Sequence, residues 1–560
     1  MRSTNYIFST SDCIRDHLRT RKRNRLFKSG STAALIAVSS LAPHLVAAQA
    51  IPISPSTLPR VGTISPRFQS FNVEMVEVTG GRFWAPYKKK AEAAPAAQPD
   101  SSASVPAGMD PSLYRYRPPI DLSNPKLRKL AAALAPLYMR VSGTWANSTY
   151  FHDSDTPAPT KPPEGFGGVL TRKEWKGVID FAKATDAQLV SSFAVSTGVR
   201  DANGVWTPVE AKKVLTFTRA NGGNIAAAEM FNEPTFASIS SVPKDYDAKA
   251  YGRDYKAFYV YISKAAPKMT ILGPGSVGEL GFASNPPIDL KMLKTTDMLD
   301  AAGTEGLDAF SYHFYGGVSR RCQRPGQPSK DTVDTALTHD WLIRTNRDEA
   351  FYGALRDKYL PGKPLWLTET GEAACGGDPW ASTFLDSFRY LNQLGTLARE
   401  GVQVVIHNTL AASDYALIDE DTLNPRPNYW AALLWRRMMG TTVLDAGAPS
   451  TSGVYVYAHC LRNQPGGVAI LAINADKSAA HEITLPEASL RYTLASDNLT
   501  STEASLNGVD LMLDSHGNLP TLTGTPMHAG KISLAPTTIT FLGVAKANNP
   551  ACRMSGANRQ

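Results

Sequence analysis

Residues 225–234 read IAAAEMFNEP, a short apolar run that ends in Asn232-Glu233-Pro234. Seven other runs share its length and composition: they are rich in Val, Ile, Leu, Phe or Ala and lack alternating polar residues. They lie at residues 69–75, 137–141, 188–193, 269–273, 309–312, 365–368 and 402–408. Runs of this kind indicate strands that are buried on both faces, as in a parallel sheet covered by helices.

Segments with a helical pattern separate most of these strands. They lie at residues 125–134, 171–184, 207–220, 245–265, 332–360, 380–401 and 429–439. Ser123 is a candidate N-cap for the first helix, and Thr171 with Glu174 predicts a capping box for the second. Eight strands that alternate with helices predict a (β/α)8 TIM barrel, and an open, doubly wound sheet is the alternative.

The first 50 residues have the features of an export leader. A basic cluster, RTRKRNRLFK at 19–28, precedes an apolar stretch at 33–48 that ends in a small-residue cleavage pattern at Ala48-Gln49-Ala50. The stretch is short and interrupted by Ser and Pro43, which argues against a membrane span. We therefore expect a secreted or periplasmic protein, cleaved near Ala50, whose mature chain has no stable membrane insertion.

The pattern of apolar and polar residues divides the remaining chain into two parts. Residues 66–440 carry the barrel pattern, with a low-complexity insertion at 91–110 that reads as flexible. From 441 to 552, short alternating runs separated by Gly, Asn, Pro and Asp predict an antiparallel β-sandwich. The Pro-rich residues 51–65 are a candidate strand of that sandwich, and 553–560 form a tail.

The charge of the chain does not favour a nucleic-acid partner. The net charge is +8, but residues 1–50 hold eight Lys and Arg against two Asp, so most of that charge lies in the leader. The nearly neutral remainder has no general attraction for a polyanion. Without Cys13 the chain keeps four cysteines, an even number that suits two disulfides in an exported protein. No Cys-x-x-Cys or closely spaced His pair is present, so we expect no metal and no cofactor.

Two glutamates stand where a barrel places its active site. Glu233 follows the fourth strand directly, and Glu369 in LWLTET (365–370) ends the seventh. The carboxyl ends of barrel strands converge on one site. Glycoside hydrolysis needs such a pair: one carboxyl protonates the leaving oxygen, and the other stays ionised to attack the anomeric carbon. His313 and His407 also lie at strand ends, where a lone histidine is usually structural, and we assign neither a chemical role.

The order of several motifs resembles glycoside hydrolase family 79, which contains heparanases and β-glucuronidases. The motifs are SPRF at 65–68, SFNVE at 70–74, PKLRKL at 125–130, YMRVSGT at 138–144, FSYHFY at 310–315, Gly376-Gly377 after the Glu369 segment, Asp414-Tyr415 and PNYW at 427–430. The resemblance runs from about residue 65 to 552. It implies a retaining enzyme with Glu233 as acid/base and Glu369 as nucleophile.

The same resemblance implies roles for six further residues. Asn232 would bind the sugar 2-hydroxyl, Tyr315 would hold the nucleophile in line, and Glu74 and Thr144 would contact the sugar. Gly376 N–H and the Tyr415 hydroxyl would bind a glucuronic acid carboxylate. One departure is notable: Ala374-Cys375 stands where the family often has a tyrosine.

Two disulfides are predicted. Cys460 and Cys552 lie in contexts that match cysteines of the family, which implies a bridge between them. Cys322 and Cys375 follow the sixth and seventh strands, which are neighbours in a barrel, so a second bridge is expected there.

The leading interpretation is a retaining β-glucuronidase that acts on glucuronides or glycosaminoglycan-type chains. Exo action is favoured over endo action, because only two basic clusters are evident, at 88–90 and 320–324. Hydrolysis of neutral β-glycosides and a non-catalytic glycan-binding role are the alternatives.

Overall fold

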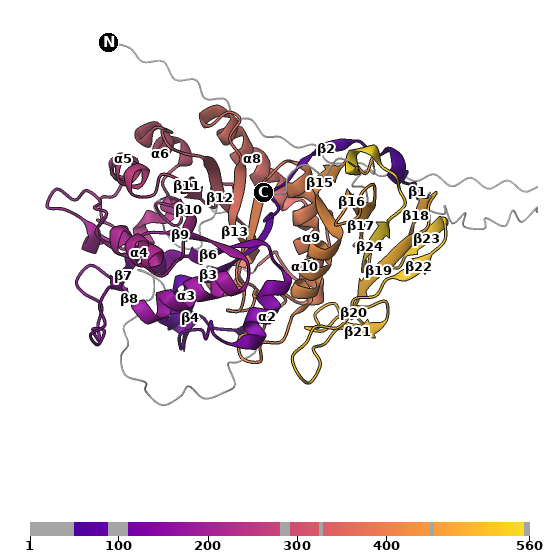
Figure 1. Ribbon diagram of the computed structural model, residues 1–560, viewed down its shortest axis with the longest axis horizontal. Helices are drawn as coiled ribbons and strands as arrows, with labels where there is room; N and C mark the ends of the chain where they lie inside the picture. Colours follow the sequence, from indigo (N-terminus) through magenta and orange to yellow (C-terminus); the bar gives the residue numbers. More distant parts are fainter. Residues whose placement is uncertain (1–49, 88–109, 281–291, 324–328, 448–452, 554–560) are drawn as a thin grey trace, which may run out of the picture. The chain divides into compact units, whose positions relative to one another are not determined.

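The barrel is complete in the computed structural model, which describes residues 50–87, 110–280, 292–323, 329–447 and 453–553. Eight parallel strands close on themselves (Figure 1). They are β3 Gln69–Glu74, β6 Leu137–Ser142, β9 Ala187–Ser192, β10 Ile225–Glu229, β11 Thr270–Ser276, β12 Ala309–Val318, β13 Leu365–Ala374 and β14 Val404–His407. The predicted TIM barrel is confirmed, and the open sheet is wrong.

Helices cover the outside of the barrel. They are α2 Pro125–Ala133, α3 Arg172–Ala184, α4 Val209–Ala220, α5 Ala248–Ala265, α6 Thr295–Ala302, α7 His339–Leu342, α8 Arg344–Tyr359, α9 Phe384–Arg399 and α10 Pro427–Met438. The capping box of Thr171 and Glu174 is confirmed at α3.

Two helix predictions are wrong. Asn124, not Ser123, caps α2, because its side chain accepts hydrogen bonds from Lys126 N and Leu127 N and Pro125 fills the first helical position. The segment 332–360 is not one helix. Thr338 caps the short α7 with its side chain, and α8 begins only at Arg344.

The helix-to-strand core and the barrel interior are separate apolar clusters. The interior cluster takes residues from six consecutive strands around the barrel: Val190, Ala227, Leu272, Ala309, Trp366, Val404 and Ile406. The sequence pattern did not indicate two small paired units beside the barrel. β4 Gly81–Trp84 pairs with β5 Tyr114–Arg117, and β7 Thr149–His152 pairs with β8 Gly168–Thr171. The predicted insertion at 91–110 lies outside the described residues, apart from Asp110, and so does the predicted leader, apart from Ala50.

The C-terminal strands form a β-sandwich of two sheets, as predicted. The larger sheet contains β15 Met439–Leu444, β16 Val454–Leu461, β17 Val468–Asn474, β19 Ser489–Ala495, β20 Ser505–Leu506, β21 Val509–Asp510, β22 Thr525–Met527 and β24 Thr538–Val544, with β2 Arg60–Thr63 on the edge beside β15. The smaller sheet is β1 Ile51–Pro52, β18 His481–Leu485 and β23 Gly530–Leu534. Figure 1 shows the N-terminal β1 beside these C-terminal strands.

The sandwich is bonded to the barrel through α9. Tyr457 of β16 donates to Asn392 Oδ1 at 2.7 Å, and its hydroxyl lies 2.8 Å from that of Thr396. Gly395 leaves room for the ring, because a Cβ there would lie 2.4 Å from it. Within the described part of the chain, no helix has the length and apolarity to cross a membrane.

Candidate active site

Glu233 lies just past the carboxyl end of β10, where the chain turns into the 3-10 helix Pro234–Ile239. Its backbone is left-handed, with φ 53° and ψ 59°. Non-glycine residues adopt this conformation at a cost, and such residues gather at active sites. The side chain is 15% exposed, so the carboxyl is largely withdrawn from water but still open to a ligand.

Glu369 lies inside β13, which runs on to Ala374 because it stays paired with β12 as far as Val318. The prediction that the strand ends at Glu369 is therefore wrong. The register shifts just before this pair: Tyr312 pairs with Leu367, and His313 pairs with Glu369. Thr368 is the extra residue, and such bulges redirect neighbouring side chains.

His313 connects the two glutamates. Its Nδ1 lies 3.0 Å from Glu233 Oε1 and 3.9 Å from Glu369 Oε2. One ligand atom from each of the three side chains falls within 4.8 Å of the others. The predicted pair of carboxyls is thus brought together, with an imidazole between them that we had expected to be structural.

Arg140 of β6 balances the negative charge of the site. It is fully buried and lies 2.7 Å from Glu229 Oε2 and 2.8 Å from Glu369 Oε2. It also donates to Asn232 Oδ1 at 2.8 Å. A buried charge is stable only when it is paired in this way, so Arg140 holds the carboxylates and the Asn232 amide in one network.

Burial and neighbouring charge separate the protonation behaviour of these groups. Burial, with the nearby Glu369 charge, raises the pKa of Glu233 against the opposing hydrogen bond from His313. Burial alone would lower the pKa of His313, but Glu369, Glu229 and Glu233 together raise it to about 9. Glu229 is also buried, yet the Arg140 guanidinium holds the pKa of its carboxyl well below its usual range.

A hydroxyl network surrounds the other oxygen of Glu369. Tyr315 donates to Glu369 Oε1 at 2.6 Å. Asn408 Nδ2 in turn donates to the hydroxyls of Tyr315, at 3.0 Å, and of Tyr415, at 3.2 Å. Two predicted residues therefore belong to this network: Tyr315 bonds directly to Glu369, and Tyr415 is linked to Tyr315 through Asn408.

A family model agrees with this geometry. The model for the N-terminal domain of glycosyl hydrolase family 79 matches residues 118–395, which include both glutamates, His313 and Arg140. The chain belongs to glycosyl hydrolase family 79. It is therefore a glycoside hydrolase.

Several relatives are similar in sequence to this family 79 chain over most of its length. Heparanase of Bos taurus is 27% identical, with 79% of this chain and 87% of the relative covered. Hyaluronoglucuronidase of Hirudo nipponia is also 27% identical, with coverages of 78% and 92%. Baicalin-beta-D-glucuronidase of Scutellaria baicalensis is 25% identical, with coverages of 76% and 83%.

Solved structures share the fold at low identity. A 4-O-alpha-L-rhamnosyl-beta-D-glucuronidase from Fusarium oxysporum has a TM-score of 0.55 at 13% identity, covering 89% of this chain and 99% of its own. A family 51 alpha-L-arabinofuranosidase from Thermotoga petrophila has a TM-score of 0.58 at 14% identity, with coverages of 88% and 99%. These two similarities establish the fold only.

The predicted contacts Glu74, at the end of β3, and Thr144, at the start of the 3-10 helix after β6, lie beside the family 79 site. Glu74 ends β3, and burial together with the Glu369 charge raises its pKa well above the usual range. Its Oε2 has no hydrogen-bond partner among the described residues. Gly143, with φ 92°, makes room for this carboxyl, because a Cβ there would lie 1.5 Å from Glu74 Oε2. Thr144 comes next, and the described residues supply no hydrogen-bond partner for its hydroxyl.

Gly376 follows Cys375 in the loop after β13 and is buried. Its carbonyl accepts a hydrogen bond from Ser413 Oγ at 3.0 Å, whereas its N–H has no partner within the described chain.

Both predicted disulfides are formed. Cys322–Cys375 joins the segments after β12 and β13 with a Cα–Cα distance of 6.4 Å, and Cys460–Cys552 joins β16 to the chain end with 5.3 Å.

The side chains of Glu233, His313 and Glu369 are also the one set of three or more possible ligands in the described structure that could hold a metal ion. Arg140 occupies Glu369 Oε2 at 2.8 Å and cannot lose its charge. That fixed positive charge opposes a cation at the same carboxylate. The expectation that the protein uses no metal or cofactor remains a prediction.

Four residues of the site were missed from the sequence as contributors to the chemistry: Arg140, Glu229, His313 and Asn408. Arg140 did carry a signal, because a charged residue inside an otherwise apolar, doubly buried strand must have a buried partner. Glu229 offered the same signal at the end of IAAAE. His313 and Asn408 lie at strand ends and could be recognised only once the strands were assembled.

Proposed function

We propose that this family 79 member is a retaining β-glucuronidase in which Glu233 is the acid/base and Glu369 the nucleophile. The observation that carries the proposal is the close approach of the two carboxyls, with one oxygen of each within 4.8 Å. Retaining enzymes hold their carboxyls about 5–5.5 Å apart, whereas inverting enzymes leave about 6.5–9.5 Å for a water molecule. The shorter spacing supports direct attack on the sugar.

Charge balance supports the division of labour between the two glutamates. With Glu229 and Glu369 ionised and with Arg140 and His313 as cations, the buried set is neutral only if Glu233 keeps its proton. A neutral set avoids an uncompensated buried charge. Glu233 is then the proton donor to the leaving oxygen, and Glu369 attacks the anomeric carbon. In the second step Glu233 takes a proton from the water that releases the sugar.

Neighbouring groups would orient the sugar and the nucleophile. Tyr315 restrains Glu369 through Oε1, and Arg140 restrains it through Oε2. The oxygen of the Asn232 amide is held by Arg140, which leaves its nitrogen to donate to the sugar 2-hydroxyl. Glu74 and Thr144, with their free polar atoms, would contact the remaining hydroxyls.

Glucuronic acid is proposed as the sugar because two donors are available for its carboxylate. These are the N–H of Gly376, which has no hydrogen-bond partner among the described residues, and the hydroxyl of Tyr415. Such donors bind an anion without adding a competing charge. The names of the relatives, which include a hyaluronoglucuronidase and a baicalin-beta-D-glucuronidase, support the same sugar.

Exo action on glucuronides or on the ends of glycosaminoglycan-type chains is favoured over internal cleavage. A cleft for a long polyanion would need free Lys and Arg. Arg321 is instead engaged in internal hydrogen bonds, and Arg320 lies over the ring of Tyr87 at 4.7 Å. We further propose a secreted or periplasmic location, supported by the two disulfides. We propose no nucleic-acid partner, because the chain beyond the leader is nearly neutral.

The test is hydrolysis of 4-nitrophenyl β-D-glucuronide compared with the matching β-D-glucoside, with the product followed by NMR. We expect a strong preference for the glucuronide and a first product with the β configuration. An α-configured first product would exclude retention. Equal turnover of the glucoside or a xyloside would replace the glucuronidase assignment with a neutral β-glycosidase.

A further inference from the structure

The loop after β13 has a strained backbone. Cys375, Gly376 and Gly377 all have left-handed φ values, of 64°, 83° and 82°. Glycine adopts this region freely, but cysteine does not. The left-handed conformation of Cys375 therefore persists only if the surroundings hold it in place.

Contacts from several segments hold this loop. The disulfide ties Cys375 to Cys322. Ser413 Oγ donates to the carbonyl of Gly376 at 3.0 Å, and Ser319 Oγ donates to that of Gly377 at 2.8 Å. The packing is tight, since a Cβ on Gly376 would lie 2.5 Å from that of Trp84.

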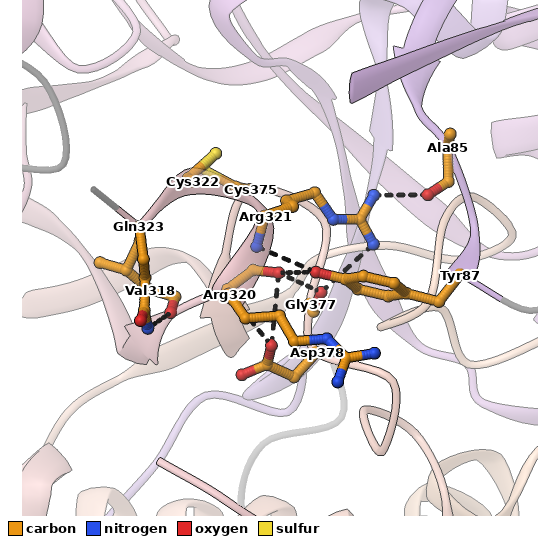
Figure 2. Close-up of a disulfide and its surroundings, with 11 residues drawn as sticks. Ala85, Tyr87, Val318, Arg320, Arg321, Cys322, Gln323, Cys375, Gly377 and Asp378 are labelled. Atoms are coloured by element: carbon orange, nitrogen blue, oxygen red, sulfur yellow. Dashed lines mark hydrogen bonds between the residues drawn. A yellow bond between two sulfur atoms is a disulfide. The ribbon is translucent and has the colours of Figure 1, made fainter. Parts of the chain in front are cut away.

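Arg321, the residue before Cys322, joins the loop to two other segments (Figure 2). Its guanidinium lies 3.9 Å from the ring centre of Tyr87 and donates to Ala85 O. It also donates to Asp414 Oδ2 at 2.8 Å and reaches Gly377 O at 3.5 Å. Asp414 accepts a second bond, from Tyr87 N at 3.1 Å.

The contacts of Arg321 fall next to both proposed carboxylate ligands. Gly377 follows Gly376, and Asp414 precedes Tyr415. We propose that Arg321 and the Cys322–Cys375 bridge are positioning residues that fix Gly376 N–H relative to the Tyr415 hydroxyl, and so determine selectivity for uronic acids. This inference rests on the proposed function.

Direct binding of the substrate carboxylate by Arg321 is disfavoured. Its side chain is only 6% exposed, and both terminal nitrogens already donate to protein oxygens. Arg321 therefore acts through the two segments that it holds.

The experiment measures selectivity, defined as kcat/KM for 4-nitrophenyl β-D-glucuronide divided by kcat/KM for the glucoside. It compares wild type with Arg321→Met and with Cys322→Ala/Cys375→Ala. We expect selectivity to fall by about 10-fold or more, because a displaced donor loses a hydrogen bond to a charged group. The loss should appear mainly as a higher KM for the glucuronide.

Cys460→Ala/Cys552→Ala is the matched control. It removes the disulfide of the sandwich, so its Tm should fall while its selectivity stays at the wild-type value. Should Cys322→Ala/Cys375→Ala fail to fold, Ser319→Ala removes a hydroxyl that bonds both Gly377 O and the Tyr87 hydroxyl, and it should lower selectivity in the same direction.

The outcomes separate this inference from the proposed function. If wild type prefers the glucuronide and the folded variants keep that preference, the positioning role alone is overturned. A wild type without any preference overturns the carboxylate site, and the positioning role falls with it. Equal loss of selectivity in the Cys460/Cys552 control would also overturn the inference, because the effect would then follow from general destabilisation.

Discussion

The environment of Glu233 suits its proposed role as the acid that protonates the leaving group. Buried beside Glu369 and bonded to His313, it is suited to hold a proton for the departing oxygen. We expect Glu233→Ala to lose little kcat/KM on aryl glucuronides with very acidic leaving phenols, which need no protonation. On alkyl or sugar leaving groups the loss should reach about 10²–10⁴-fold.

A series of leaving groups measured on Glu233→Ala and Glu369→Ala checks this prediction. Glu369→Ala should be inactive on all of them, since no substrate escapes the need for a nucleophile. A uniform loss across the series in Glu233→Ala would contradict its role as the acid.

A variant of Tyr415 that lacks only the hydroxyl tests the proposed binding site for the substrate carboxylate. Tyr415→Phe removes a hydroxyl whose partner within the protein is Asn408 Nδ2. We expect kcat/KM for the glucuronide to fall by a factor equivalent to about 1–3 kcal/mol of lost transition-state stabilisation, because one hydrogen bond to a charged group is lost. The glucoside should lose much less. Equal losses on both substrates would indicate that Tyr415 serves the Tyr315–Asn408 network instead.

Among the secondary-structure elements, α2 offers a matched pair of variants. Asn124 accepts two backbone N–H bonds at its start, whereas the hydroxyl of the neighbouring Ser123 donates to Asp121 and does not cap the helix. Asn124→Ala should cost about 1 kcal/mol of unfolding free energy, and Ser123→Ala should cost less than about 0.5 kcal/mol. Denaturant titration of both variants checks the difference, and a larger effect of Ser123→Ala would contradict it.

The sequence predicted where the barrel strands begin, because runs buried on both faces have no polar alternation. It did not predict how far β12 and β13 extend. Gly316, Gly317 and Gly371 lie in the extensions, and only the pairing of the two strands keeps these residues extended. The polar network behind the glutamates was also missed. It joins residues that are far apart in the chain, such as Arg140 and Glu369, and local pattern carries no information on such pairs.

For the whole molecule, buried ionisable groups predict how stability varies with pH. Burial raises the pKa of Glu77 and Asp348 to about 7, and the carboxylates around His313 raise its pKa to about 9. A group whose pKa is raised on folding binds protons more tightly in the native state, so its stabilising contribution is lost as pH rises. Burial lowers the pKa values of His407 and His459 to about 4. Their contribution to the stability of the protein is therefore lost only as the pH falls below about 6.5.

We therefore expect Tm to fall from about pH 6.5 to 9, with about 3 kcal/mol of the loss due to His313. Differential scanning calorimetry across this range checks the sign. His313→Gln keeps Glu229, Glu233, Glu369 and Arg140 but removes the titrating imidazole, so its curve should be flatter between pH 7 and 9. A wild-type Tm that rises in this range would contradict the prediction.

Both ends of the described chain belong to the sandwich. β1 pairs with β18, β2 pairs with β15, and Asn549 near the C-terminus donates to Pro55 O and Leu58 O. In topological terms the barrel is an insertion within the sandwich. During synthesis β2 stays unpaired until β15 emerges, and β1 until β18 emerges, although the barrel strands in between can already close. A stop codon at the start of β15 would thus spare every side chain of the proposed site and still leave both β1 and β2 without partners, which makes synthesis of the C-terminal strands a requirement for folding of the N-terminal ones.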